Sequence, residues 1–353
     1  MRLLCDYPLA TLFFRHWDVK TDNEVGVVIA KARFQRPDGG RFRLDPAAPT
    51  LVLADVFEGD PAVTPLHNEQ DLAPTKPATD VIIRAVARSP RAEALSDWSV
   101  QVIIPDRLAY DFRVRGPVEW RKTRGTWGMT RAELVTEVPI SYGLAYGGMV
   151  PGLEPDQPPR AFEANPAGLG FATPAFLSQV TAFAAPQIGD VADFMQSDPL
   201  QEMTVQGLGP VAKGWLARRV WAGTFDAHWQ AKRHPRMPLD HSPRYWNAAH
   251  RRLQLAPKLT GTEAVLVHRI SHADRPIQIA LPGAGLLLRA TSVGGDVSAT
   301  TMDLRLDLDT VDLDLSAPDP AGHSLLMTWR GQIPAPERFH EARLYGIDVR
   351  EQE

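Results

Sequence analysis

The sequence contains a single cysteine, Cys5, so no disulfide bond can form within its 353 residues. A disulfide-stapled secreted scaffold is therefore excluded, and a reducing compartment suits the chain. No run approaches the roughly 18 apolar residues that a membrane-spanning helix needs. The apolar stretch from Pro8 to Phe14 is too short for the hydrophobic region of a signal peptide. We therefore expect a cytoplasmic protein without membrane contact.

A surplus of positive charge is also lacking. The 38 Lys and Arg residues stand against 42 Asp and Glu residues, which gives a formal net charge of -4 and a pI of about 6.2. Nucleic-acid-binding domains usually carry a basic face or stripe, so no nucleic-acid partner is expected. With 44% hydrophobic and 23% charged residues, the composition is that of an ordinary globular protein.

The motifs of common enzyme classes are missing as well. There is no G-x-x-x-x-G-K-[ST] phosphate loop, no G-x-S-x-G nucleophile elbow and no H-E-x-x-H zinc motif. The glycines of Gly207–Gly209 are followed by Pro210, which is typical of a turn. His228, His234 and His241 are not spaced by the four residues that place two imidazoles on one helix face. We expect no catalytic residue, no cofactor and no metal ion.

Proline, by contrast, is abundant, with 31 residues or about 9% of the chain against an average of about 5%. The prolines recur at the edges of segments. Because proline cannot donate to a sheet and cannot sit inside a helix, this spacing favours short strands and ordered loops. We expect a mainly β fold, in which antiparallel sheets pack as a sandwich or in barrel-like layers, with long Pro- and Gly-rich loops and a few short helices.

Alternating and β-branched segments predict the strands. Residues 25–34 are apolar and β-branched, and a turn signal at 37–40 leads into the alternating residues 41–44, which predicts a hairpin. Residues 135–140 are expected to form an edge strand because Pro139 interrupts them. Further strands are predicted at 81–87, 99–104, 108–114, 263–270, 277–281, 286–290 and 324–330.

The clearest pattern lies in residues 300–315, where apolar residues alternate with charged ones. The alternation slips at Asp309-Thr310, so a turn or a bulge is expected to join two half-buried strands there. The glycine of a calcium-binding loop is missing. The aspartates are instead expected to form a solvent-exposed face that protects a sheet edge. They are Asp303, Asp307, Asp309, Asp312 and Asp314.

Composition divides the chain into three regions. They are a β-rich N-terminal half at 1–145, a loop-rich middle with short helices at 146–260, and C-terminal strands at 261–353 that are expected to pack with the N-terminal half. In the middle region a capped helix is predicted at 227–233, with Thr224 or Asp226 as its N-cap, and a helical turn at 243–250.

Four tryptophans are interleaved with arginines in this middle region. They are Trp215, Trp221, Trp229 and Trp246, with Arg218, Arg219, Arg233 and Arg244 between them. Protein interfaces are enriched in aromatic residues and arginine. An aromatic mini-core with arginines stacked on it would give the same pattern, so the segment indicates either an interface or a small core.

Several ordered motifs carry a family resemblance. The segment Asp71–Asp80 is similar to the D-L-x-P-x-K-P-x-T-D core of the DUF2169 family. Tyr142–Gly148 followed by Asn165–Phe171 resembles that family's Y-x-x-A-[FY]-G-G and N-P-x-G-x-G pattern. Trp221–Asp226 resembles its [YW]-A-G-T-[YF]-D motif, and Tyr245–Ala249 echoes a downstream motif. Together the matches suggest one DUF2169 domain over about residues 10–335.

The sequence departs from the family pattern in two places. The Arg and Glu that usually precede the A-[FY]-G-G motif are absent from 140–146, and the stretch between Phe171 and Gly207 is diverged. If these residues contact cargo, the departures imply a different cargo.

The resemblance implies an accessory protein of the type VI secretion system. Such a protein would act as an adaptor or chaperone that binds a toxic effector and helps load it onto the spike formed by VgrG and PAAR proteins. The family supplies no catalytic residues. Within the motifs, Lys76 is expected to pair with Asp71 or Asp80, and Gly147-Gly148 to need a positive φ or close packing. The residues expected to contact a partner are Asp71, Lys76, Asp80, Tyr146, Asn165, Trp221, Phe225, Asp226, Trp229 and Trp246.

A β-rich hydrolase is the alternative. It would use carboxylates on the central loops, such as Asp55, Glu58 and Asp71. This hypothesis requires two carboxyl groups that converge on a cleft, one of them with a raised pKa.

Overall fold

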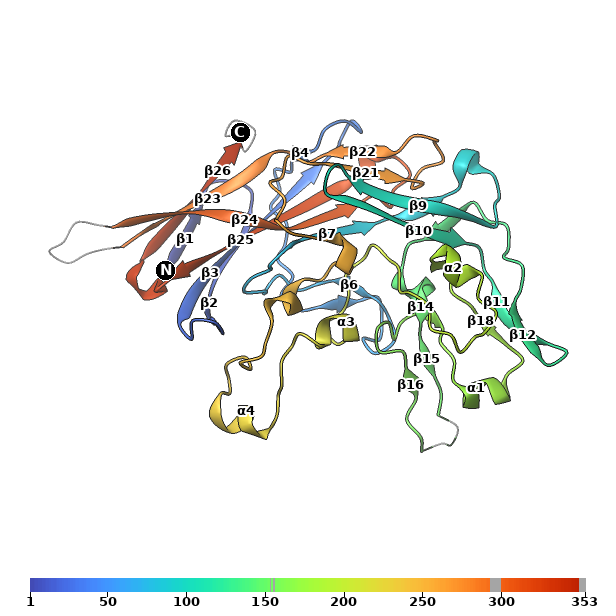
Figure 1. The fold of residues 1–353 in the computed structure, drawn as a ribbon. Helices are drawn as coiled ribbons and strands as arrows, with labels where there is room; N and C mark the ends of the chain where they lie inside the picture. Colours follow the sequence, from blue (N-terminus) through green and yellow to red (C-terminus); the bar gives the residue numbers. More distant parts are fainter. Residues whose placement is uncertain (153, 155, 293–299, 349–353) are drawn as a thin grey trace.

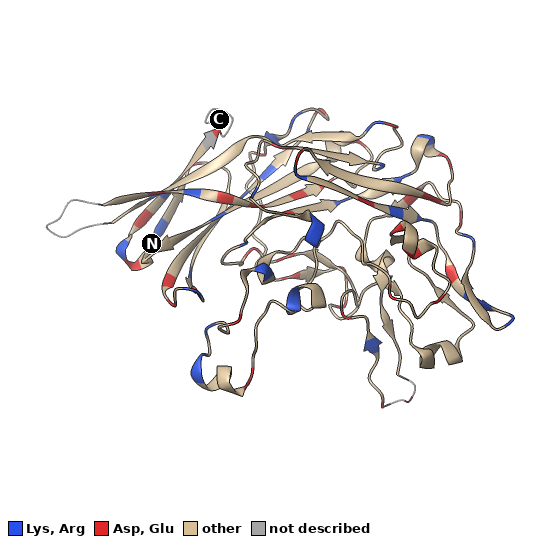
Figure 2. Cartoon of the chain, viewed as in Figure 1, with Lys and Arg blue, Asp and Glu red and all other residues tan. Residues whose placement is uncertain are grey.

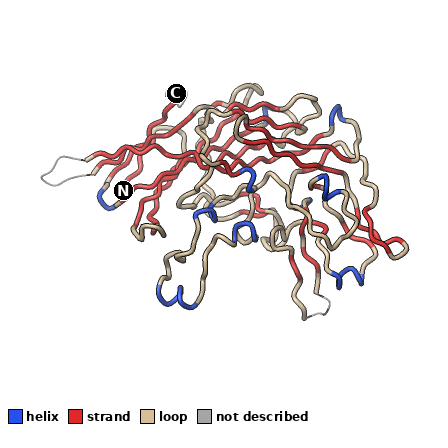
Figure 3. Tube along the Cα trace, in the orientation of Figure 1, coloured by secondary structure: helices blue, strands red, loops and turns tan. Residues whose placement is uncertain are grey.

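The structure is a computed structural model that describes residues 1–152, 154, 156–292 and 300–348. These residues form a mainly β protein with several sheets and four short α-helices (Figure 1). Long loops connect the strands, above all in the middle of the chain (Figure 3). The predicted fold class is confirmed.

The largest sheet has ten strands and nearly closes on itself, since the two ends of its main path approach each other. The path runs through β1 (Arg2–Cys5), β26 (Glu341–Asp348), β23 (Ala284–Thr291), β24 (Thr301–Asp314), β25 (Ser324–Pro334), β3 (Glu24–Gln35) and β2 (Ala10–Trp17). Off this path, β4 (Arg43–Leu44) pairs with β3, and β7 (Thr79–Arg84) pairs with β24 and with β20 (Gln254–Leu255). Most pairings are antiparallel, but β1 with β26 and β7 with β24 are parallel.

A five-stranded antiparallel sheet packs against the large one (Figure 1). Its order is β19 (Ile188–Gly189), β10 (Leu108–Arg115), β9 (Asp97–Ile104), β21 (Ala264–His268) and β22 (Ile277–Ala280). One hydrophobic core includes inward-facing residues of both sheets, among them Val81, Val100, Val265 and Leu313. Tyr110, Phe112 and Val114 share the buried face of β10, as their alternation predicts.

Smaller sheets and short helices complete the fold. A three-stranded sheet contains β12 (Thr126–Met129), β11 (Glu119–Thr123) and β18 (Ala182–Ala184). The two-stranded pairs are β5 (Val56–Phe57) with β6 (Leu66–Asn68), β8 (Val86–Arg88) with β13 (Glu137–Pro139), β14 (Tyr146–Gly147) with β17 (Leu169–Gly170), and β15 (Met149–Val150) with β16 (Arg160–Ala161). The α-helices are α1 (Pro174–Gln179), α2 (Val191–Phe194), α3 (Leu216–Arg219) and α4 (Ala227–Lys232). No helix in the described ranges is both long and apolar enough to cross a membrane.

The slip in the 300–315 pattern is a β-bulge. β24 runs as one strand, and its register with β25 shifts between Leu308 and Thr310. Before the bulge β24 pairs with β23, and after it with β7. The bulge is therefore the point at which β24 exchanges one neighbour for another, and no turn divides the strand.

Two predictions about the aspartates of β24 are wrong. Asp309 is fully buried, because it sits in the bulge and pairs with Arg330 of β25. Nor does β24 lie at a sheet edge, since it has neighbours on both sides. Asp303 and Asp307 are exposed as predicted. Alternation alone cannot identify the one carboxylate that a bulge turns toward an arginine.

Most predicted strands appear within a residue or two of their expected bounds, including the hairpin of β3 and β4. The sequence did not predict β1, β2 and β26 of the large sheet, nor the short strands β5, β6, β11, β12 and β14–β20. β2 has neither a fully buried run nor a clean alternation of buried and exposed residues, so its period-2 signal is weak. Because β1 pairs with β26, the first and last described strands lie side by side.

Candidate functional site

Asp80, near the start of β7, is fully buried and accepts four hydrogen bonds. Lys76 Nζ donates at 2.8 Å and Asn247 Nδ2 at 2.9 Å. The backbone N–H groups of residues 248–249 donate at 2.8 and 3.2 Å. This carboxylate thus joins two of the motif segments, which are far apart in the sequence.

Lys76 in turn connects Asp80 to a second carboxylate. Its buried ammonium donates to Glu69 Oε2 at 2.9 Å and to Thr310 Oγ1 at 3.2 Å. The other oxygen of Glu69 accepts from Arg218 Nη2 at 2.5 Å, and Lys213 Nζ lies 4.0 Å from it. We refer to this group as the ionic hub. It consists of Glu69, Lys76, Asp80, Lys213 and Arg218.

The hub keeps Glu69 and Lys76 charged despite their burial. Burial alone would raise the pKa of Glu69, but the positive charges of Lys76, Arg218 and Lys213 outweigh it and hold that pKa at about 2. Burial likewise opposes the charge of Lys76, yet Asp80 and Glu69 raise the pKa of Lys76 above its ordinary value. Removing one member would leave an uncompensated buried charge, which is strongly destabilising.

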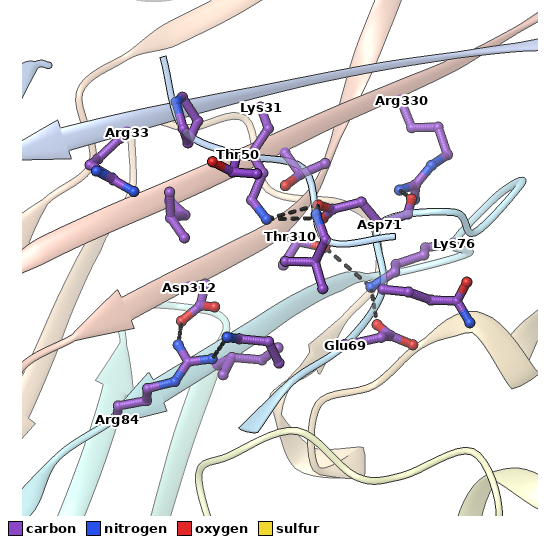
Figure 4. A pocket seen from close by; sticks show the side chains of 17 residues that line it. Lys31, Arg33, Thr50, Glu69, Asp71, Lys76, Arg84, Thr310, Asp312 and Arg330 are labelled. Carbon is purple, nitrogen blue, oxygen red and sulfur yellow. Dashed lines mark hydrogen bonds and ion pairs between the residues drawn. The ribbon is translucent and has the colours of Figure 1, made fainter. Parts of the chain in front are cut away.

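Two further ion pairs lie beside the hub, and Figure 4 shows one of them, Lys31 with Asp71. Asp71 accepts from Lys31 Nζ at 2.9 Å and from the backbone N–H of Val52 at 2.8 Å. Arg330 binds Asp309 and donates to the carbonyl of Asp71 at 2.9 Å.

The predicted pairing of Lys76 with Asp80 is confirmed by the 2.8 Å contact between them. The alternative pairing with Asp71 is wrong, because Lys31 of β3 binds that carboxylate.

The Tyr142–Gly148 and Asn165–Phe171 motifs form a second close-packed unit. Asn165 Nδ2 donates to the carbonyls of Tyr142 and Tyr146 at 2.9 and 3.0 Å. Gly148 has a φ of +105°, and a Cβ there would lie 2.5 Å from the carbonyl oxygen of Gly168. The prediction that the glycine pair serves a positive φ and close packing is confirmed.

Tyr146 and Asn165 are both buried, at 2% and 0% exposure. Tyr146 belongs to a small separate core and packs edge-on against Phe162, with ring centroids 4.9 Å apart. Burial raises the pKa of Tyr146 to about 12. A partner would reach these two residues only through the residues that cover them.

Residues 216–244, which we call the aromatic arm, project from the sheets with α4 at their tip (Figure 1). Asp226 is the N-cap of α4, because its carboxylate accepts from the backbone N–H of Trp229 at 2.8 Å. Thr224, the other predicted cap, instead donates to Asp240 at 2.7 Å. The ring of Trp229 packs edge-on against Phe225, with centroids 4.8 Å apart.

The arm is attached to the turn between β2 and β3. The guanidinium of Arg236 lies 3.6 Å from the ring centroid of Trp17, a cation–π geometry. Arg233 pairs with Asp22 at 3.1 Å. These contacts give the projecting arm a defined position.

The four tryptophans of this region have different environments. Trp215 is buried in the main core and packs edge-on against Tyr142. Trp246 is half-buried beside Tyr245. Trp221 is 36% exposed beneath the guanidinium of Arg244, and Phe225 is 51% exposed. The segment therefore contains both part of a core and an exposed apolar surface. Each of the two interpretations of its sequence, a small core or an interface, fits a part of it.

The carboxylates of the hydrolase hypothesis have separate surroundings. Asp55 pairs with Lys213 at 3.2 Å, and Asp71 with Lys31. Glu58 is exposed between β5 and β6. In the part of the chain that the structure describes, no group of three or more His, Cys, Asp or Glu side chains is arranged to hold a metal ion.

Comparison with known families adds to this geometry. Residues 21–330 match the family model described as "Uncharacterized protein conserved in bacteria (DUF2169)". The chain belongs to the DUF2169 family. No curated protein and no solved structure matches it significantly. In this DUF2169 protein Asp80 binds the motif segment around Asn247, and Asn165 binds the Tyr142–Gly148 motif.

Sequence reasoning located Lys76 and Asp80 but missed Glu69, Arg218 and Asn247, which complete the surroundings of the two charges. Each of these three residues lies in or next to a segment that the sequence pattern singles out. Glu69 lies just before the Asp71–Asp80 core, Arg218 among the tryptophans, and Asn247 inside a motif. Nothing in the local pattern indicates that residues so far apart in the sequence share one site.

We predict that Glu69→Gln lowers the free energy of unfolding at neutral pH by about 3–5 kcal/mol, because the buried Arg218 then lacks its carboxylate partner and Lys76 keeps only Asp80. Urea denaturation followed by circular dichroism measures the change. Glu93→Gln is the matched control, since Glu93 pairs with Arg91 on the surface and its loss is expected to cost under about 0.5 kcal/mol. Equal effects of the two variants would contradict the hub's importance.

The same carboxylate predicts an acid limit to stability. The pKa of Glu69 is about 2 in the folded chain against an ordinary value of 4.5, so its contribution is complete above pH 4.5. As the pH falls toward 2, about 3 kcal/mol of stability is expected to be lost. Unfolding free energies measured across this range would show a shallower decline in Glu69→Gln. If the unfolding free energies of the unmodified chain and of Glu69→Gln fall in parallel as the pH is lowered, Glu69 is not the group that sets the acid limit.

Gly148→Ala is expected to destabilise the protein by about 3 kcal/mol or more, because the new Cβ meets the Gly168 carbonyl at a positive φ. Gly125→Ala is the control, since Gly125 also has a positive φ but no atom within 4 Å of the new Cβ. Thermal unfolding of the two variants separates the cost of the clash from that of the backbone angle.

Proposed function

We propose that this DUF2169 protein is a non-catalytic adaptor or chaperone. It binds a type VI secretion effector and helps load it onto the VgrG or PAAR spike. The proposal places it in the bacterial cytoplasm, where it would meet newly made effector. The type VI assignment comes from the family resemblance, and the observation that supports protein binding is the exposed apolar surface of the aromatic arm.

The arm exposes several large apolar side chains. Besides Trp221 and Phe225, its exposed large apolar side chains include Val220 at 59% and Leu239 at 75%. Clusters of exposed apolar residues that include aromatic anchors are typical of protein-binding surfaces. Exposed apolar side chains on one projecting loop favour a role in binding another protein.

The charge of the arm suggests what kind of surface it would meet. Residues 216–244 contain six Lys and Arg against two Asp, in a chain whose net charge is negative (Figure 2). Arg219, Arg233 and Arg236 pair with carboxylates elsewhere in the chain. Lys232 and Arg244 have no carboxylate within 4.0 Å among the described residues. The arm therefore suits a partner surface that is apolar at its centre and acidic at its rim.

The test is binding of the purified chain to the effector and to the PAAR and VgrG proteins encoded beside it, measured by size-exclusion chromatography with light scattering and by calorimetry. The double variant Trp221→Ala, Phe225→Ala is expected to weaken the complex by about 2 kcal/mol or more, as truncation of aromatic anchors does.

The double variant Leu134→Ala, Met195→Ala is the control, because these side chains are 61% and 80% exposed and lie outside the arm. It is expected to bind as the unmodified chain does, and all variants should keep the same unfolding temperature. If the unmodified chain binds no effector or spike protein, the adaptor role is refuted. If both double variants lose binding equally, the arm is not the binding surface.

A further inference from the structure

The outer face of the large sheet carries a polar pocket of about 220 Å³ next to the ionic hub. Its floor comes from four adjacent strands, β3, β25, β24 and β7. Alternation along β3 sends Ala30, Ala32 and Phe34 into the core and turns Lys31 and Arg33 to this outer face. The loop from Pro49 to Asp71 covers part of the pocket.

Five cations line the pocket, and four of them have a carboxylate partner. The pairs are Lys31 with Asp71, Lys76 with Glu69 and Asp80, Arg84 with Asp312, and Arg330 with Asp309. Arg33 differs, because its guanidinium has no carboxylate within 4.0 Å and no hydrogen-bond partner among the described residues (Figure 4). The pocket is left with one unpaired positive charge.

A threonine hydroxyl accompanies this guanidinium. Thr328 of β25 is 3% exposed and lines the pocket. Its hydroxyl has no hydrogen-bond partner in the described part of the chain, so it is available to a ligand in the pocket. In the β3–β25 register Arg33 is opposite Leu326 and diagonal to Thr328. Such diagonal neighbours are about 7–8 Å apart, within the reach of an arginine.

We propose that this pocket binds a carboxylate group, held by the guanidinium of Arg33 and the hydroxyl of Thr328. The planar fork of an arginine donates two parallel hydrogen bonds to a carboxylate, and a threonine hydroxyl donates a third. Thr50 lies at the exposed rim of the pocket and adds another hydroxyl there. This site does not depend on the adaptor role.

Charge and size select a monoanion. One unpaired cation balances one negative charge, and the carboxylates of Glu69, Asp71 and Asp312 already line the pocket, so a dianion such as phosphate would meet repulsion. The volume is below the roughly 300–1,000 Å³ of typical small-molecule sites. A small free acid fits it, and so does the carboxyl group of a peptide.

The experiment follows the Nε–Hε resonance of Arg33 by NMR in the full chain labelled with ¹⁵N-arginine. Five probes are titrated at constant ionic strength. They are sodium acetate, a tetrapeptide with a free C-terminus, the same tetrapeptide as its amide, sodium chloride, and inorganic phosphate above its second pKa. Acetate and the free-acid peptide are expected to give a saturable shift, and the amide and chloride none.

Variants identify the groups that bind, with acetate affinity measured by calorimetry. Arg33→Gln is expected to weaken binding by at least about tenfold, and Thr328→Val by about threefold, as loss of a charged and a neutral hydrogen bond implies. Arg43→Gln is the control, because Arg43 lies on neighbouring β4 and pairs with Asp38 on the surface; it should bind normally. If Arg33→Gln does not fold, Thr328→Val carries the same test.

The probes also separate the two sources of a carboxylate. Tighter binding of the free-acid peptide than of acetate would assign the pocket to a protein chain end, and binding of acetate alone would assign it to a small free acid. The proposal is overturned if no carboxylate gives a saturable shift, if phosphate binds more tightly than acetate, or if Arg43→Gln weakens binding as much as Arg33→Gln does.

Discussion

The buried pairing of Lys76 with Asp80 is the interaction on which the arrangement of the rest depends. Asp80 binds the 247–249 backbone, and Lys76 binds Glu69, which in turn binds Arg218 at the base of the aromatic arm. Thr310, beside the bulge of β24, bonds to the same ammonium. One lysine and one aspartate thus set the positions of a central strand, of the loop over the polar pocket and of the projecting arm.

This arrangement places two unlike surfaces on either side of one charged centre. The aromatic arm is apolar, basic and exposed, whereas the pocket at Arg33 is small and polar and is built on the rigid face of a sheet. Binding groups held by strands keep a more constant geometry than groups held by loops. The two surfaces therefore suit different tasks, a broad protein contact and recognition of a single functional group.

The sequence predicted what depends on local pattern. Alternation located β10 and the bulge in β24, and the family motifs located Lys76, Asp80 and Asn165. It could not predict that Glu69 meets Arg218, because those residues are 149 positions apart. It also misjudged Asp309, which looks like its exposed neighbours until Arg330 from another strand is placed beside it. Burial of a charge is decided by a distant partner, which local periodicity does not contain.

The pairing of β3 with β25 has a consequence for how the chain is made. Ribosomes release the N-terminal strands first, yet the antiparallel partner of β3 begins at Ser324. Until β25 has been made, one edge of the apolar β3 therefore has no neighbour, and an open strand edge invites pairing with other chains. Closing so long a loop also makes folding slow. A protein proposed to act as a chaperone would itself need protection until β25 has been made.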